Sequence, residues 1–269
     1  MRRTIAYFAI LMPICLVFVP QQVPTALSIP PESSYRDDGK VLPAGDEMAA
    51  LAEKDPVAFL DACLKKQHRE VQGYSGVLHK QERIKGTDNP PEVIEFAFRE
   101  NPYSVLLKWR EGARDAKSSL FVHGENNDRV AVLPKIVPIP LDLPVDGAMA
   151  QKAGRYLISE FSLRQATERT LKAWAAAKDH GNLRVEYLGK QAVPELEGRM
   201  CYRLKRTCTQ PEDDDVATVE IAIDAQTWMQ IGSVLRRDDG HLIGSYYFTD
   251  LQTNPTFDPA TFTRASLKK

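Results

Sequence analysis

FAFRENPYSVLLKW, residues Phe96 to Trp109, is the stretch that decides the fold class. It reads as two short strands joined by an Asn-Pro turn. Side chains alternate between the two faces of a strand, and every other residue of the second half is apolar or aromatic: Tyr103, Val105, Leu107 and Trp109. The pattern predicts one continuous apolar face on a β sheet. This face is either ordinary core or the wall of a cavity for an apolar ligand, and the sequence leaves both open.

Similar strand patterns lie on both sides of this stretch, separated by short polar turns. Before Pro134 the predicted strands are Tyr74–Glu82, Val93–Arg99, Tyr103–Arg110, Ser118–His123 and Arg129–Leu133. Later in the chain they are Leu183–Leu188, Met200–Thr209, a strand containing Val219, Ile221 and Ile223, then Trp228–Arg237 and Leu242–Leu251. Sequential strands with short connections predict an antiparallel sheet.

Two main helices accompany the strands. Asp55-Pro56 predicts the start of the first helix, with proline at its first position and Gly73 at its end. The second runs from Ser162 to Gly181, and Ser162 and Gln165 predict a capping box at its start. A shorter helical piece is expected within residues 147–159. The fold class is therefore α+β: a single curled antiparallel sheet, an incomplete β-barrel of about ten or eleven strands, covered by two or three helices.

The N-terminus predicts an export signal. A basic start precedes an apolar run from Ile5 to Val19, too short for a typical membrane span, and small residues follow it. We expect residues 1–28 to be a signal peptide cleaved near Ser28, with an uncleaved N-terminal anchor as the alternative. Residues 29–54 are expected to be a disordered leader with a possible short helix, and residues 55–269 to be the folded domain.

Composition and motifs exclude several classes of function. The 269 residues carry a formal net charge of −1, which offers no basic excess for nucleic acid. The five histidines are scattered and form no known catalytic or metal motif, so no catalytic residue, metal or cofactor is assigned. The acidic run Asp213–Asp215 is interpreted as a solvated turn rather than a cation site.

Three cysteines follow the predicted signal: Cys63, Cys201 and Cys208. Cys201 and Cys208 lie on one predicted strand, about 23 Å apart if extended, which is too far for a disulfide. A bridge from Cys63 to either of them, or buried free thiols, are the alternatives.

The segment PKIVPIPLDLPV, residues 134–145, places apolar residues between four prolines. Proline lacks a donor for the sheet ladder, so a central strand is excluded, and the segment is too apolar for a freely solvated loop. We expect it to lie across an apolar surface.

Five segments, in this order, resemble the bacterial family catalogued as domain of unknown function 1571: HKQERIKG, FAFRENPYSVLLKW, FVHGENNDRVAVLP, LDLP and YYFTDLQTNPTFDPATF. The resemblance covers Asp55 to Phe262, and the family is related in fold to LolA/LolB-like periplasmic lipoprotein carriers. The resemblance implies a LolA-like half-barrel of eleven strands, with an apolar cavity between the sheet and a helical lid. In the carriers, that cavity takes up acyl chains. The family often has a glycine-rich sequence after its third strand. This chain departs from that pattern, since its segment REGARDAKSS contains only one glycine, Gly112.

The expected function is non-catalytic binding of a hydrophobic ligand by an exported protein of the periplasm or cell envelope. The expected partner is a lipid or lipoprotein acyl chain. The candidate cavity-lining residues are Phe96, Phe98, Tyr103, Val105, Leu107, Trp109, Ile136, Ile139, Leu141 and Trp174. Arg83 and Arg99 are the candidates for contacting a headgroup. The alternatives are an envelope interaction module with a filled core and a protein partner, and a hydrolase with an unrecognised site.

Overall fold

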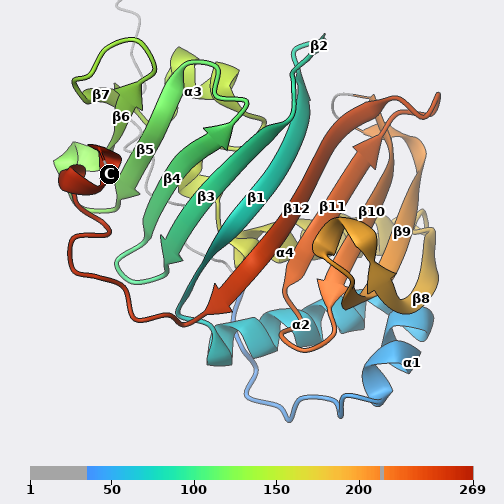
Figure 1. The fold of residues 1–269 in the computed structure, drawn as a ribbon. Helices are drawn as coiled ribbons and strands as arrows, with labels where there is room; N and C mark the ends of the chain where they lie inside the picture. The colour runs from blue at the N-terminus through green and yellow to red at the C-terminus, as the bar shows by residue number, and fades with distance from the viewer. Residues whose placement is uncertain (1–34, 213–214, 269) are drawn as a thin grey trace, which may run out of the picture.

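The computed structural model describes residues 35–212 and 215–268 (Figure 1). The predicted signal peptide and its cleavage near Ser28 lie outside the described residues, as do Asp213 and Asp214. In the described part of the chain, no helix combines the length and the apolar character needed to cross a membrane.

A single antiparallel sheet of twelve strands forms the body of the structure, which confirms the predicted fold class. The strand order is β7-β6-β5-β4-β3-β1-β12-β11-β10-β9-β8, with the short β2 paired to β1. The strands are β1 (Gly73–Ile84), β2 (Thr87–Asp88), β3 (Glu92–Arg99), β4 (Ser104–Glu111), β5 (Ala116–Val122), β6 (Arg129–Pro134), β7 (Leu141–Pro144), β8 (Val185–Val193), β9 (Arg199–Glu212), β10 (Val216–Asp224), β11 (Gln230–Arg236) and β12 (Leu242–Thr253).

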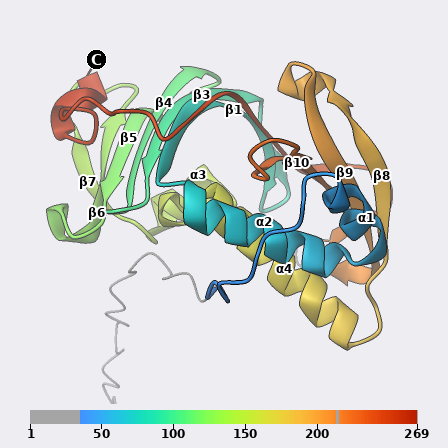
Figure 2. The same ribbon diagram turned by 90° about the horizontal axis from the view of Figure 1, so that it is seen from below.

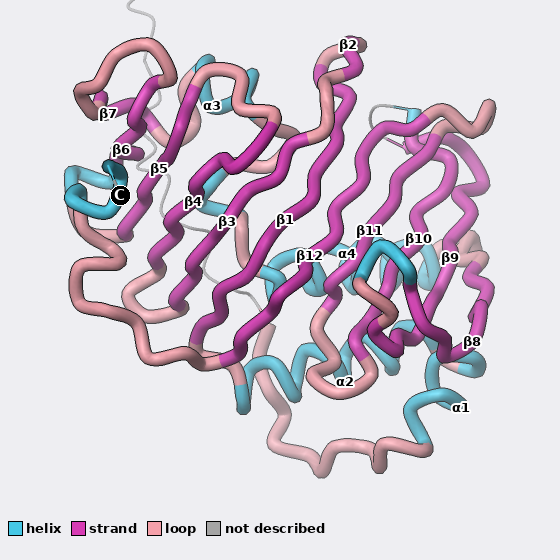
Figure 3. Tube along the Cα trace, viewed as in Figure 1, coloured by secondary structure: helices cyan, strands magenta, loops and turns pink. Residues whose placement is uncertain are grey.

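The two halves of the chain meet at the centre of this sheet. The first long strand, β1, lies antiparallel beside the last, β12 (Figure 3). In this pair Leu78 lies opposite Phe248. The strands that follow β1 in sequence continue the sheet on one side, and those that precede β12 continue it on the other. The proline-rich segment supplies β7 at an edge, in agreement with its exclusion from the centre.

Helices cover the hollow side of the curled sheet, where α2 and α4 run across the arch (Figure 2). The α-helices are α1 (Glu47–Lys54), α2 (Pro56–Glu70), α3 (Ala148–Ala153) and α4 (Leu163–Asp179). Short 3-10 turns are η1 (Asn126–Asp128), η2 (Ile158–Glu160), η3 (Pro194–Leu196) and η5 (Arg264–Lys268). The start of α2 is as predicted, because the Asp55 carboxylate accepts a 3.1 Å hydrogen bond from the Ala58 N–H.

The capping box predicted at the start of α4 is wrong. Ser162 precedes the helix, but its side chain makes no capping hydrogen bond, and its hydroxyl instead donates to Glu100. Two buried tyrosines of the sheet accept from N–H groups at this end: Tyr74 from Leu163 at 2.6 Å, and Tyr103 from Phe161 at 3.0 Å. Tyr74 on β1 therefore supplies an acceptor for the first N–H group of α4.

The register of β3 and β4 places the predicted apolar residues on one face. Phe96 lies opposite Leu107, and Phe98 lies opposite Val105. The opposite face of these strands is also buried, because a cluster that includes Leu106 packs under the C-terminal segment. Burial on both faces explains the near-continuous apolar sequence of β4.

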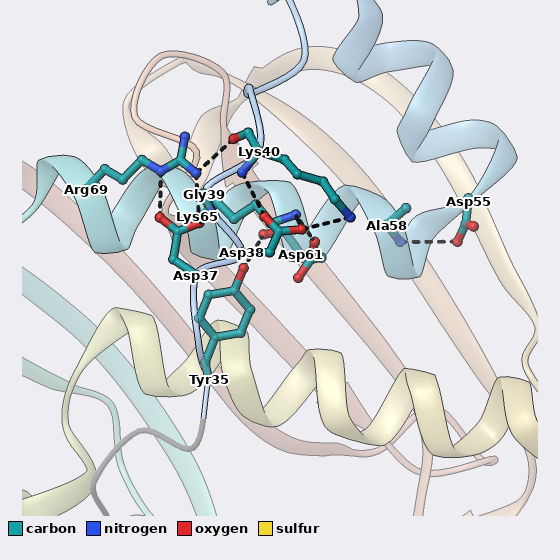
Figure 4. Close-up of polar contacts among 10 residues, drawn as sticks. All are labelled: Tyr35, Asp37, Asp38, Gly39, Lys40, Asp55, Ala58, Asp61, Lys65 and Arg69. Carbon is teal, nitrogen blue, oxygen red and sulfur yellow. Dashed lines mark hydrogen bonds and ion pairs between the residues drawn. The ribbon is translucent and has the colours of Figure 1, made fainter.

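The segment expected to be a disordered leader contacts the folded domain from residue 35 onward, which corrects that expectation for residues 35–54. The Asp37 carboxylate accepts two hydrogen bonds from Arg69 on α2, of 2.6 and 2.7 Å, and Asp38 pairs with Lys65 at 3.0 Å (Figure 4). The predicted short helix is α1, whose Met48 is fully buried against α2 and the sheet. Charge pairing and one buried helical face together hold this polar segment.

Within residues 35–212 and 215–268, none of the three cysteines that follow the predicted signal forms a disulfide. Cys63 on α2 and Cys201 on β9 are buried, and Cys208 is half-buried. The predicted alternatives for Cys63 are a disulfide to Cys201 or Cys208 and a buried free thiol, and the structure shows the buried free thiol.

Candidate functional site

A cavity of about 650 Å³ lies between the hollow face of the sheet and the helices α3 and α4. Its volume is within the range of roughly 300–1,000 Å³ that is typical of small-molecule sites. Residues of both halves of the sheet line it, from Leu141 on β7 to Arg206 on β9. The cavity therefore extends across most of the curled sheet.

The wall of the cavity is mainly apolar. Its larger apolar residues on the sheet are Leu78, Ile94, Leu107, Trp109, Val130, Val132, Leu141, Leu143, Val219, Leu235, Tyr246 and Phe248. The helical side adds Met149, Tyr156, Leu157, Ile158, Phe161, Leu163 and Trp174. A wall of this composition suits an apolar ligand.

Four of the residues predicted to line a cavity do line it: Leu107, Trp109, Leu141 and Trp174. Phe96, Phe98, Tyr103 and Val105 share the same face of the sheet but lie in the packed core. The two isoleucines of the β6–β7 loop point away from the cavity into solvent, with 92% of Ile136 and 64% of Ile139 exposed.

The packed end of this face is filled by aromatic side chains. The ring of Phe96 lies 5.3 Å from that of Phe161 and 5.7 Å from that of Phe248. The Tyr103 hydroxyl also donates to the Ile158 carbonyl at 3.3 Å, which fixes the turn before α4 against the sheet. The face is thus solid where α4 begins and hollow farther along β4, at Leu107 and Trp109.

The two arginines predicted to meet a headgroup lie outside the cavity lining. Arg83 pairs with Asp88 at 2.8 Å in the β1–β2 hairpin. Arg99 donates to the Ser104 hydroxyl, and its guanidinium lies 4.7 Å from the ring centroid of Phe262. Both therefore take part in local contacts of the sheet rather than of the cavity.

A buried charged cluster, which the sequence analysis missed, forms one wall of the cavity. The Lys80 ammonium on β1 lies 3.1 Å from Glu82 and 2.8 Å from Glu92, and Lys80 and Glu82 both line the cavity. Trp109 joins the cluster, since its indole N–H donates to Glu92 at 3.0 Å. Two carboxylates around one ammonium satisfy charges that would be costly to bury alone.

Tyr246 on β12 completes this charged wall. Its hydroxyl donates a 2.7 Å hydrogen bond to Glu82, and burial, followed by the Glu82 charge, raises the pKa of Tyr246 well above its usual range. Its ring lies over Gly244, where an added Cβ would be 3.0 Å from the tyrosine hydroxyl. Glycine at this position therefore gives Tyr246 the room to reach Glu82.

A second polar group of the lining bridges α4 and β11. The Thr170 hydroxyl donates to the Gln230 side chain at 3.0 Å, and the Gln230 amide donates to Ser233 at 2.9 Å. On the helical side of the lining, the Arg169 guanidinium lies 4.5 Å from the ring centroid of Tyr156. The contact between Thr170 and Gln230 fixes α4 against the sheet, and that between Arg169 and Tyr156 joins α4 to the segment that follows α3.

The signal for the charged wall was present in the sequence. Leu78, Lys80 and Glu82 alternate on β1, so their side chains share one face. An apolar residue followed two and four positions later by charges on the same face marks a polar site within an apolar wall. No such pattern surrounds Arg99, which lies on the face covered by the C-terminal segment.

The acidic run Asp213–Asp215 is described only at its last residue. Asp215 pairs with Arg237 at 3.7 Å and is largely exposed. Among residues 35–212 and 215–268, no group of three His, Cys, Asp or Glu side chains is arranged to hold a metal ion.

One family model matches the chain. It is described as a protein of unknown function (DUF1571) and matches residues 71–268, which include every strand of the sheet. No curated protein matches the chain by sequence.

Several solved structures are similar to the chain at low sequence identity. A crystal structure of MucB has 15% identity and a TM-score of 0.48, and the match covers 77% of this chain but 62% of that chain. The Mycobacterium tuberculosis lipoprotein LppX has 10% identity and a TM-score of 0.43, with 76% of this chain and 99% of that chain covered. A LolA superfamily protein from Nitrosomonas europaea has 8% identity and a TM-score of 0.35, with 77% and 98% covered.

Proposed function

The chain belongs to the DUF1571 family, and we propose that it binds an acyl chain, a lipid or the acyl chain of a lipoprotein without altering it chemically. The cavity of about 650 Å³ with a mainly apolar wall carries this proposal. An alkyl chain that leaves water for such a wall gains about 0.8 kcal/mol per methylene, or about 8 kcal/mol for ten. The loss of translational and rotational freedom on binding offsets part of this gain.

The chemistry of the cavity lining supports binding rather than catalysis. Among the described residues that line it there is no histidine and no cysteine. The lining serines and threonine therefore have no imidazole beside them to act as a general base. The charged groups Lys80 and Glu82 are engaged with each other and with Glu92 or Tyr246.

We place this activity in the cell envelope or periplasm. The proposal rests on the signal-like sequence of residues 1–28, with its basic start and apolar run. An exported protein that encloses an acyl chain would keep that chain out of water between membranes.

Mass spectrometry of the organic extract of the purified protein tests the proposal. We expect a lipid or another acyl-chain compound in stoichiometric amount, and we expect the delipidated protein to bind it again. An extract without lipid, together with a delipidated protein that rebinds none, would contradict the proposal.

A second candidate function is interaction with another protein of the envelope. The exposed isoleucines of the β6–β7 loop favour it, since Ile136 is 92% exposed and lies beside the exposed Ile139. If this function holds, a partner captured by the delipidated protein should be lost when Ile136→Ser and Ile139→Ser are combined. Capture that is unchanged in this variant would contradict a role for the loop.

A further inference from the structure

The charged wall of the cavity contains a buried carboxylate oxygen without a hydrogen-bond donor. Glu82 is 4% exposed, and its Oε1 atom accepts from the Tyr246 hydroxyl at 2.7 Å and from the Arg155 N–H at 3.3 Å. Its Oε2 atom accepts no hydrogen bond from any described residue. The Lys80 ammonium lies 3.1 Å from Oε2 as an ion-pair partner, without the geometry of a hydrogen bond. A buried acceptor of this kind is costly unless something donates to it.

A potential donor lies next to this acceptor. The Lys80 ammonium has three N–H groups and lies beside two carboxylates, those of Glu82 and Glu92. Gly154 faces both atoms: an added Cβ there would lie 3.5 Å from Glu82 Oε2 and 3.7 Å from Lys80 Nζ. Lys80, Glu82 and Gly154 all line the cavity, so a ligand can approach this donor and acceptor.

The ammonium of Lys80 and the carboxylate of Glu82 together suit a ligand hydroxyl better than a ligand carboxylate. A hydroxyl can donate to Glu82 and accept from Lys80 at the same time. A carboxylate has no proton to donate, and it would bring a third negative charge to the carboxylates of Glu82 and Glu92. Arg114 lies 3.8 Å from Glu92 but is not part of the cavity wall.

We infer that the wall formed by Lys80, Glu82 and Gly154 selects ligands whose chain ends in a hydrogen-bond-donating group, such as a hydroxyl, over free fatty acids. This inference rests on the proposed function and assigns the class of ligand to it. A site built to hydrogen-bond a hydroxyl discriminates strongly against an analogue that cannot make the bond. We expect dodecanol to bind at least roughly tenfold more tightly than dodecanoate.

Displacement of a fluorescent fatty-chain probe from the delipidated protein measures both affinities. The assay is run at about pH 8, where the fatty acid is ionised. Glu82→Gln replaces the free acceptor with an N–H donor, so we expect the preference for dodecanol over dodecanoate to fall to about one. Glu186→Gln, at an exposed glutamate of β8 outside the cavity, is the control and should keep the wild-type ratio.

A second variant covers the case in which Glu82→Gln does not fold. Gly154→Ala adds one methyl group near the pair, at an extended backbone position that alanine adopts readily. We expect it to reduce the preference for dodecanol over dodecanoate severalfold, because the added methyl group lies beside Glu82 Oε2 and Lys80 Nζ. Equal wild-type affinities for the two ligands, or a ratio unchanged in both variants, would overturn the inference. If neither ligand displaces the probe and none binds directly, the proposed function itself fails, and this inference fails with it.

Discussion

The hydroxyl of Tyr74 on β1 accepts a 2.6 Å hydrogen bond from the backbone N–H of Leu163, the first residue of α4. Both residues are almost fully buried, so the bond ties the helical lid to the centre of the sheet. It also replaces the cap that Ser162 does not provide. This contact is one of those that hold α4, which lines the cavity, against the sheet.

Tyr74→Phe should therefore destabilise the protein. The variant keeps the ring but leaves the N–H of Leu163 without its acceptor, and an unsatisfied buried donor costs about 1–3 kcal/mol. The free energy of unfolding in urea measures the loss. Tyr35→Phe is the comparison, since its hydroxyl is only half-buried and donates to the Asp61 carbonyl over a longer distance of 3.4 Å, and it should cost less than about 1 kcal/mol. Equal stabilities of wild type and Tyr74→Phe would show that the bond does not hold the lid.

Ala166→Phe should abolish most ligand binding by filling the cavity. Ala166 lies on α4 and lines the cavity, so a phenyl ring there would occupy space that the chain of the ligand needs. We expect affinity for a fatty-chain probe to fall at least roughly tenfold, equivalent to about 1.4 kcal/mol. The matched control is Ala176→Phe, at an exposed position of the same helix outside the lining, which should bind as the wild type does. Equal loss in both variants would assign the effect to helix disturbance instead of the cavity.

Removing the charge of Arg83 or Arg99 should leave ligand affinity unchanged. Both side chains lie outside the cavity lining, and each contacts groups of the sheet. Arg83→Gln and Arg99→Gln are compared with wild type in the same displacement assay. An affinity change of more than about threefold in either variant, about 0.65 kcal/mol, would show that the substituted arginine contributes to ligand binding.

The contact between Asp37 and Arg69 predicts that the Asp37 carboxyl group has an unusually low pKa. Hydrogen bonds from Arg69, then the Gly39 N–H, lower the pKa of Asp37 to about 2, and this carboxylate stays ionised where an unperturbed aspartate is half protonated, near pH 3.9. A group with a lowered folded-state pKa stabilises the folded state above its unfolded pKa. The contribution is then lost as the pH falls through the folded value.

Carbon-13 NMR of the Asp37 carboxyl group measures this titration. In the wild type the midpoint should lie near pH 2. Arg69→Gln should raise it toward the unperturbed value, whereas Lys66→Gln, which removes a charge paired with Glu70 on the same helix, should have little effect. A wild-type midpoint near pH 3.9 would mean that the N-terminal segment does not dock on α2 in solution.

The sheet was predictable because alternation reports which residues share a face. Alternation predicts that Leu107 and Trp109 share one face of their strand, and the pairing of β3 with β4 places Phe96 opposite Leu107 on that face. Alternation carries no information on where helices lie along that face. Whether Phe96 packs against Phe161 or faces a void is decided by the turn before α4, about 60 residues away in the chain.

The errors at the site have the same physical origin. Ile136 and Ile139 are apolar, but they sit in the turn that joins β6 to the edge strand β7, where the two strands leave them no surface to cover. Arg83 and Arg99 were chosen as cations near apolar strands, without regard to the face on which each lies. Lys80 does line the cavity. It follows Leu78 by two positions on β1, so the same alternation that predicts the faces of the other strands places both side chains on one face.

The most direct test of the account is a crystal structure of the delipidated protein with an alkyl chain brominated at its end, since bromine can be located by anomalous scattering. We predict one bromine site inside the cavity, beside Leu107 or Val132. Bromine found only on the protein surface, or no bound chain at concentrations that saturate the displacement assay, would contradict it.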